Sequence, residues 1–174
     1  MERKVDARNI DAIKEEARKR ASGYELQYHG CGQSVMLALQ EVLGLEDKLA
    51  FKAASDFCGG IGFQGKFCGA LAGGLMILGM KYGRSDMQEK VPGIAKGILP
   101  AYKLMKRFEQ EFGTTVCLEL TDGLLTPPSD EEINLMGTYP ELTEGQGDEL
   151  AAKCSPLVGK TAAMVIEIIS EQES

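Results

Sequence analysis

The sequence lacks an apolar segment long enough to cross a bilayer. Its longest apolar run, from Phe67 to Met80, is shorter than the roughly 20 residues that a membrane-spanning helix needs. The first twenty residues are charged throughout and lack the apolar core of a signal peptide. We therefore expect a soluble, cytoplasmic protein without membrane insertion.

Positive charge is also scarce. The chain of 174 residues has 19 Lys and Arg residues against 26 Asp and Glu residues, which gives a net charge of −7. This balance is the opposite of the basic surface that binds nucleic acid, so that class of partner is excluded. The acids collect between Ser129 and Leu150, a stretch with no Lys or Arg. We predict an exposed acidic loop at about 121–150, with an acidic docking surface as the alternative.

No stretch shows the alternating pattern of a β-strand, whereas helical spacing recurs along the chain. One example is the apolar series that starts at Cys31 and continues to Val42 before Gly44. We therefore predict one all-α domain over residues 1–174, with its core in 17–169. Its helices would pack around a central, glycine-rich apolar helix at Phe67 to Tyr82. The other helices are expected at 10–28, 31–42, 46–57, 87–113 and from about Cys154 to Ile169.

Two glycine motifs that could suggest nucleotide binding are rejected. Gly60, Gly62 and Gly65 spell GxGxxG, but the segment before them has helical spacing, and a dinucleotide site requires a buried strand there. The segment from Cys154 to Thr161 resembles a P-loop but lacks its first glycine.

The chain also lacks any pair of cysteines spaced C-x-x-C. This absence excludes a zinc ribbon, a thioredoxin-type pair, a ferredoxin run and a c-type haem. Cys31, Cys68 and Cys154 each stand at the expected start of a helix, and Cys117 follows a break after a long helix. Cysteines at segment ends are typical of a site assembled in three dimensions, although each one alone could be buried filler. At helix starts they would also be favoured as thiolates.

These segments resemble a family of small helical proteins named for their C-GCAxxG-C-C pattern and described as redox-active. "GCGQSVMLALQEVLGL" is similar to the first cysteine segment of the family, and "CGALAG", from Cys68 to Gly73, matches its signature. "FEQEFGTTVCLEL" and "KCSPLVGKTAAMVIEII" carry the third and fourth cysteines. The resemblance extends from about Ala17 to Ile169. Most members come from anaerobes, and similar sequence occurs in split-Soret cytochrome c, where an iron–sulfur centre is associated with this part.

The resemblance implies a redox-active protein that binds an iron–sulfur cluster for electron transfer, with a redox partner protein. Its expected metal ligands are Cys31, Cys68, Cys117 and Cys154. Glycines of the preceding loop would approach the cofactor and offer N–H groups to its sulfur atoms: Gly59, Gly60, Gly62 and Gly65. Cys58 stands where the family usually has glycine, so no role is assigned to it. His29, the only histidine, is either a surface residue or a proton relay.

Two other functions stay open at this stage. One is thiol–disulfide exchange without metal, with Cys68 as the attacking thiol and another cysteine resolving the product. The other is a structural or partner-binding domain whose cysteines hold zinc or fill space. Tight packing of the glycines between Leu71 and Gly79 could support a homodimer.

Overall fold

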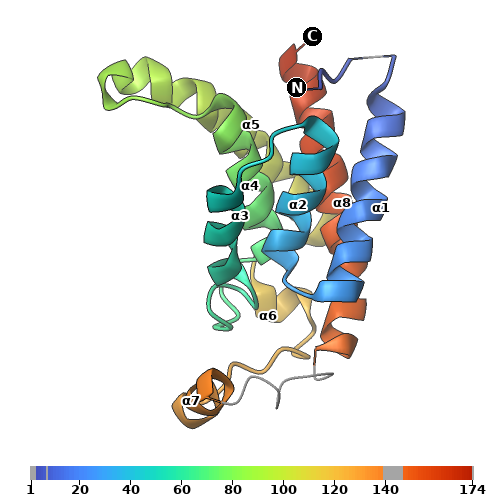
Figure 1. Ribbon diagram of the computed structural model, residues 1–174, viewed down its shortest axis with the longest axis vertical. Coiled ribbons are helices and arrows are strands. Elements are labelled where there is room, and N and C mark those ends of the chain that lie inside the picture. Colours follow the sequence, from blue (N-terminus) through green and yellow to red (C-terminus); the bar gives the residue numbers. More distant parts are fainter. Residues whose placement is uncertain (1–2, 7, 139–146, 174) are drawn as a thin grey trace.

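The computed structural model describes residues 3–6, 8–138 and 147–173, and within these residues the protein is helical without a named strand (Figure 1). The prediction of an all-α fold is confirmed. The α-helices are α1 (Ile10–Tyr28), α2 (Cys31–Leu43), α3 (Lys48–Ala53), α4 (Gly69–Tyr82), α5 (Lys90–Phe112), α6 (Cys117–Leu120), α7 (Asp130–Thr138) and α8 (Asp148–Glu173). Two 3₁₀ helices, η1 (Ala54–Phe57) and η2 (Met87–Glu89), precede the glycine loop and α5.

Helices α1 and α8 lie side by side along the bundle (Figure 1). A Cβ atom at Gly159 would overlap Ser22 and would lie 2.8 Å from the carbonyl oxygen of Arg18, so the two helices approach closely at this glycine. Ser22 Oγ donates a hydrogen bond to the carbonyl oxygen of Ser155 (2.8 Å), and Ser155 Oγ donates one to that of Ser22 (3.2 Å). This contact fixes the position of α8 near its Cys154.

Helix α4 packs against α2, α5 and α8. It is buried along most of its length because apolar or small residues occupy every side, so the helix has no face suited to water. A Cβ atom at Gly73 would overlap the carbonyl oxygen of Gly32 in α2, and one at Gly69 would lie 2.6 Å from Cys31 Sγ. The backbones of α2 and α4 therefore touch at these glycines, and the starts of the two helices lie close together.

Helix α5 has two halves with different surroundings. In its second half, Leu104 and Phe108 are fully buried in the core. Its first half extends away from the bundle together with η2 and forms an arm (Figure 1). Pro100 lies between the two halves, and a proline inside a helix removes a backbone hydrogen bond and favours a kink.

The structure corrects the sequence prediction in the last third of the chain. Residues 130–138, predicted as part of a loop, form α7, and residues 139–146 of the predicted acidic loop lie outside the described residues. Helix α8 begins at Asp148, so the prediction that Cys154 starts a helix is wrong. Pro156 lies inside α8, where the helix continues on both sides of the missing N–H group. The segment from Cys154 to Thr161 is therefore helical, which agrees with the rejection of a P-loop.

The contact between α2 and α4 predicts opposite effects for two substitutions in one helix. We expect Gly73→Ala to lower the free energy of unfolding by about 1–3 kcal/mol, because its methyl group would overlap the backbone of α2. Gly79→Ala meets no atom within 4 Å and should raise it by up to about 1 kcal/mol through helix propensity. Urea unfolding of both variants tests the contact, and equal stability of the two would contradict it.

Candidate functional site

The starts of three helices meet at one end of the bundle, and each bears a cysteine. Cys31 is the first residue of α2, Cys68 is the N-cap residue of α4, and Cys117 is the first residue of α6. Gly30 precedes Cys31 with φ +85°, a left-handed conformation that glycine adopts without strain. The prediction that Cys31 starts a core-facing series is confirmed, because Cys31 and the other members of the series are buried.

Backbone hydrogen bonds hold the segments of Cys68 and Cys117 together. The N–H of Cys68 donates to the carbonyl oxygen of Thr115 (2.9 Å), and the N–H of Cys117 donates to that of Lys66 (3.0 Å). Between them, Phe67 and Val116 form an isolated antiparallel bridge. The two cysteines are distant in sequence, but each directly follows a residue of this bridge, so they lie near each other.

The glycine loop between η1 and α4 lies against the same cysteines. It is preceded by helical residues, as expected from the rejection of a dinucleotide site. A Cβ atom at Gly60 would lie 2.6 Å from Cys117 Cβ, so only glycine allows this approach. The N–H groups of Gly62 and Gly65 already donate within the loop, to the carbonyl oxygens of Asp56 (2.8 Å) and Gly59 (2.9 Å).

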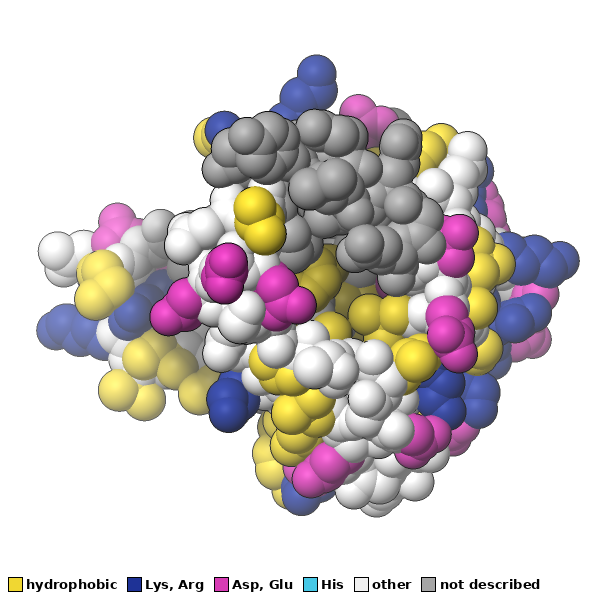
Figure 2. All heavy atoms as spheres, turned by 90° about the horizontal axis from the view of Figure 1, so that it is seen from below, with side chains coloured by type: hydrophobic (Ala, Val, Ile, Leu, Met, Phe, Trp, Pro, Cys, Tyr) yellow, Lys and Arg dark blue, Asp and Glu magenta, His cyan; other side chains and the backbone are white. Residues whose placement is uncertain are grey.

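The fourth cysteine of the expected set comes from the side of a long helix. Cys154 lies seven residues into α8 and is partly buried, three residues after the buried Ala151. Both residues line a cavity of about 880 Å³ at this end of the molecule. In Figure 2, which is seen from below, apolar side chains lie at the bottom of a hollow and acidic side chains lie near it.

This cavity, called the cysteine cavity below, is lined by Cys31, Cys58, Cys117 and Cys154. Gly59, His29 and Glu25 also line it, together with Glu132 and Glu149. Cys68 is buried and, among the described residues, is not part of the lining. It is nevertheless close enough for its charge to raise the pKa of Cys31 and of Cys154. The structure thus brings the four expected cysteines into one region and adds Cys58, to which the sequence assigned no role.

Burial dominates the chemistry of these thiols. Because a thiolate is poorly solvated there, burial raises the pKa of Cys58 to about 11 and that of Cys68 to about 12. Burial also raises the pKa of Cys154 to about 12, with a further rise from the charge of Glu25. The pKa values of Cys31 and Cys117 are raised for the same first reason. The free thiols are therefore protonated at neutral pH, contrary to the thiolates expected at helix starts.

Glu25 is a site residue that the sequence analysis missed. It is 5% exposed, and Ser34 Oγ donates a hydrogen bond to its Oε2 (3.1 Å). Burial raises its pKa to about 7, and the hydrogen bond from Ser34 opposes the rise. A signal was present, because Glu25 continues the buried series Ile13, Ala17 and Ala21 at intervals of four. A carboxylate on the inner face of a helix indicates a polar function.

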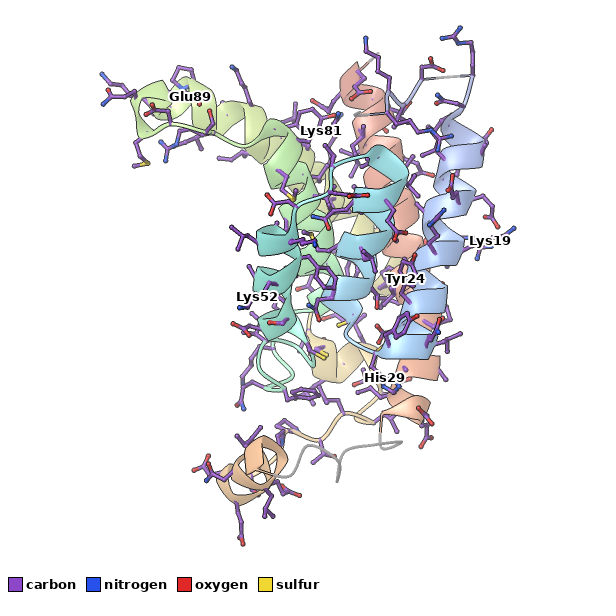
Figure 3. All side chains as sticks on the ribbon, viewed as in Figure 1. Lys19, Tyr24, His29, Lys52, Lys81 and Glu89 are labelled. Carbon is purple, nitrogen blue, oxygen red and sulfur yellow. The ribbon has the colours of Figure 1, made fainter. Side chains whose placement is uncertain are left out.

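His29 lies at the lower end of α1, next to the cavity (Figure 3). Its Nε2 is 3.2 Å from Asp148 Oδ1 at the start of α8. A Cβ atom at Gly147 would overlap the imidazole ring, so the turn before α8 packs directly on His29. The histidine therefore links the ends of two helices at the border of the cavity, while more than a third of its side chain stays exposed.

The fold and the gathered thiols define a small all-α cysteine protein. Residues 29–168 match the family described as "Putative redox-active protein (C_GCAxxG_C_C)", and this match covers most of the chain. The chain belongs to this family, as its sequence motifs indicated. Neither the curated proteins nor the solved structures contain a match.

Two further observations concern membrane-spanning helices and groups of metal ligands. Among the described residues, no helix has both the length and the apolar character needed to cross a membrane. In the same part of the chain, no three His, Cys, Asp or Glu side chains form a group that could hold a metal ion as they stand.

The buried carboxylate predicts a specific pH dependence of the metal-free protein. Because the folded-state pKa of Glu25 (about 7) exceeds its ordinary value of 4.5, its contribution to stability is complete below pH 4.5 and is lost as pH rises through 7. We expect the free energy of unfolding to fall by about 3 kcal/mol more in the wild type than in Glu25→Gln over this window.

Urea unfolding at pH 4, 6 and 8.5 measures this difference. Glu46→Gln removes an equal charge from an exposed position and serves as the control, which should follow the wild type. Parallel pH profiles for wild type and Glu25→Gln would contradict the assignment of a buried, neutral carboxyl group.

Proposed function

We propose that this protein transfers electrons through an iron–sulfur cluster held in the cysteine cavity by Cys31, Cys68, Cys117 and Cys154. The observation that carries the proposal is the position of these residues. They come from four separate segments, three line one cavity, and Cys68 lies next to it. The family match supports redox activity, and the cluster is our inference from the thiols and the cavity.

The chemistry of the donors fits such a group. Cysteine thiolates are the usual ligands of iron–sulfur clusters, and soft sulfur donors select soft metals and clusters over hard cations. Three of the four proposed ligands line a cavity of about 880 Å³, which provides room for a cofactor of several atoms. When bound, a cluster would supply one-electron oxidation and reduction. The protein would supply the ligands, the burial and the hydrogen bonds that set the potential.

The state of the free thiols favours a metal over disulfide exchange. A thiol attacks a disulfide as its thiolate, and the raised pKa values of Cys58, Cys68 and Cys154 leave little thiolate at neutral pH. Metal binding displaces the thiol protons and stabilises the thiolates directly. Glu25, with a pKa near 7, lies where it can accept a proton during this loading.

Local structure around two ligands would offset the added negative charge. Cys31 and Cys68 stand at the N-terminal ends of α2 and α4, where unpaired N–H groups and the helix dipole favour an anion. The backbone N–H groups of Leu71 and Ala70 already oppose the rise in the pKa of Cys68. The role of Gly59, Gly60, Gly62 and Gly65 within this proposal is chiefly steric, since Gly60 admits Cys117 and two of the N–H groups are used inside the loop.

A redox partner protein belongs to this proposal. Glu132 and Glu149 line the cavity together with His29, so the approach to the proposed cofactor is acidic. Complementary charge steers electron-transfer partners during their encounter, and a partner with a basic contact surface fits this end of the molecule.

The proposal predicts the metal content of protein purified without oxygen. The wild type should be brown and contain iron with acid-labile sulfide, and single substitutions to serine at Cys31, Cys68, Cys117 and Cys154 should each lose most of the iron. Cys58→Ser is the matched control and should keep it, because this cysteine lines the cavity but lies outside the family pattern. Absorption spectra, iron analysis and sulfide analysis make the measurement.

Other results would replace the proposal with one of its rivals. Colourless, metal-free protein whose thiol count changes with redox conditions would indicate thiol–disulfide exchange led by Cys68. Stoichiometric zinc without sulfide would indicate a structural site.

A further inference from the structure

The glycine loop contains a left-handed turn next to the cysteine cavity. Five consecutive residues have positive φ angles: Gly59 (+60°), Gly60 (+75°), Ile61 (+69°), Gly62 (+55°) and Phe63 (+59°). Glycine adopts this conformation freely, whereas a β-branched or aromatic residue adopts it at a cost in free energy. Ile61 and Phe63 therefore hold side chains at positions where the backbone by itself favours glycine.

The two side chains of this turn have different surroundings. Ile61 is 43% exposed, whereas Phe63 is partly buried and lines the cysteine cavity. Phe57 and Phe67, which stand before and after the turn, pack against the main hydrophobic core. Among the described residues, Phe63 is not one of the side chains that pack there. Its ring therefore belongs to the wall of the cavity and not to the core.

The ring of Phe63 lies on the backbone beside two cysteines of the cavity. A Cβ atom at Gly59 would lie 2.6 Å from Phe63 Cδ1 and 2.9 Å from Phe63 Cγ, so the ring packs directly on this glycine. Cys58 precedes Gly59 in the chain, and a Cβ atom at Gly60 would lie 2.6 Å from Cys117 Cβ. The ring and Cys117 thus pack against neighbouring residues of one turn.

Backbone hydrogen bonds fix the turn that carries the ring. The N–H of Phe63 donates to the carbonyl oxygen of Cys58 (3.1 Å), and the N–H of Gly65 donates to that of Gly59 (2.9 Å). The loop is also joined to α6, because the N–H of Leu118 donates to the carbonyl oxygen of Gly65 (3.1 Å). The position of the ring is therefore set by a closed, hydrogen-bonded loop.

We propose that Phe63 shields Cys58 and Cys117 from water, and with them the proposed cofactor. The apolar shell around a metal centre controls the access of solvent and the reduction potential, and an aromatic ring covers a large area. Reduction adds negative charge to a cluster, and water stabilises that charge, so removal of the ring should raise the potential. The effect on the cofactor rests on the proposed function, whereas the shielding of the thiols does not.

Alkylation of the reduced, metal-free protein tests the shielding. Iodoacetamide is added at one fixed pH, and mass spectrometry identifies the cysteines that it modifies. In Phe63→Gly, Cys58 and Cys117 should react about ten times faster than in the wild type, because the rate depends on the access of the reagent to the thiol. Cys68 is 5% exposed and, among the described residues, is not part of the lining, so its rate should not change.

Ile61→Gly is the matched control. It places the same residue in the same left-handed turn but removes a side chain that is exposed to solvent, so the rates should stay at their wild-type values. Phe63→Leu keeps an apolar side chain at the site and should restore slow alkylation. Both glycine variants should retain the helical circular dichroism spectrum of the wild type, because glycine adopts a positive φ angle without strain.

The iron-loaded protein gives a second measurement. Phe63→Gly should have a higher reduction potential than the wild type and should lose the absorbance of its cluster faster in air, and Ile61→Gly should do neither. Equal alkylation rates in Phe63→Gly and Ile61→Gly would overturn the shielding, even if the wild type contains iron and sulfide. A wild type without iron whose Phe63→Gly variant still reacts faster would instead refute the proposed function and support the shielding.

Discussion

The direct contact between the backbones of α2 and α4 is the constraint on which the cysteine cavity depends. Gly73 lies against the carbonyl oxygen of Gly32, and Gly69 lies against Cys31 Sγ. Side chains at these positions would separate the helices, and separation would carry Cys31 away from Cys68. The same small residues that allow tight packing therefore also set the spacing of two proposed ligands. This is why glycines inside a buried helix, which cost conformational entropy, are tolerated here.

Burial controls the charge of the groups around the cysteine cavity. Its thiols are neutral in the free protein because burial opposes their charge. Burial also raises the pKa of Glu25 to about 7. A bound cation would reverse the preference of the thiols, so that cofactor loading and proton release become one linked process. Burial that would hinder a free nucleophile suits a redox cofactor, because it excludes water and helps to set the potential.

The two ends of the bundle have different structures. Helices α1 and α8 span its length and connect the two ends. At one end α2, α4, α6 and α8 present cysteines from four segments, and at the other end the first half of α5 leaves the bundle beyond Pro100. The proposed cofactor site thus lies at the end of the molecule away from the first half of α5 (Figure 3). The core between the two ends, with Leu39, Leu71 and Ile166 fully buried, keeps their relative positions fixed.

The sequence by itself determined the all-α class, helices α1 and α2, the family and the identity of the proposed ligands. Helix α1 has the predicted bounds, and α2 begins at Cys31 and is capped by Gly44, as its sequence pattern indicated. These predictions succeed because helical periodicity and a C-terminal glycine cap depend only on residues close together in the sequence. The predicted start of α8 near Cys154 was wrong. The helix begins at Asp148 and continues through Pro156, because packing against α1 outweighs the tendency of a proline to end a helix. Only the tertiary structure decided that Glu25 and Cys58 join the cavity and that Cys68 lies beside it. These relations depend on how distant segments pack, and neither composition nor spacing along the chain encodes the distance between residues on different helices.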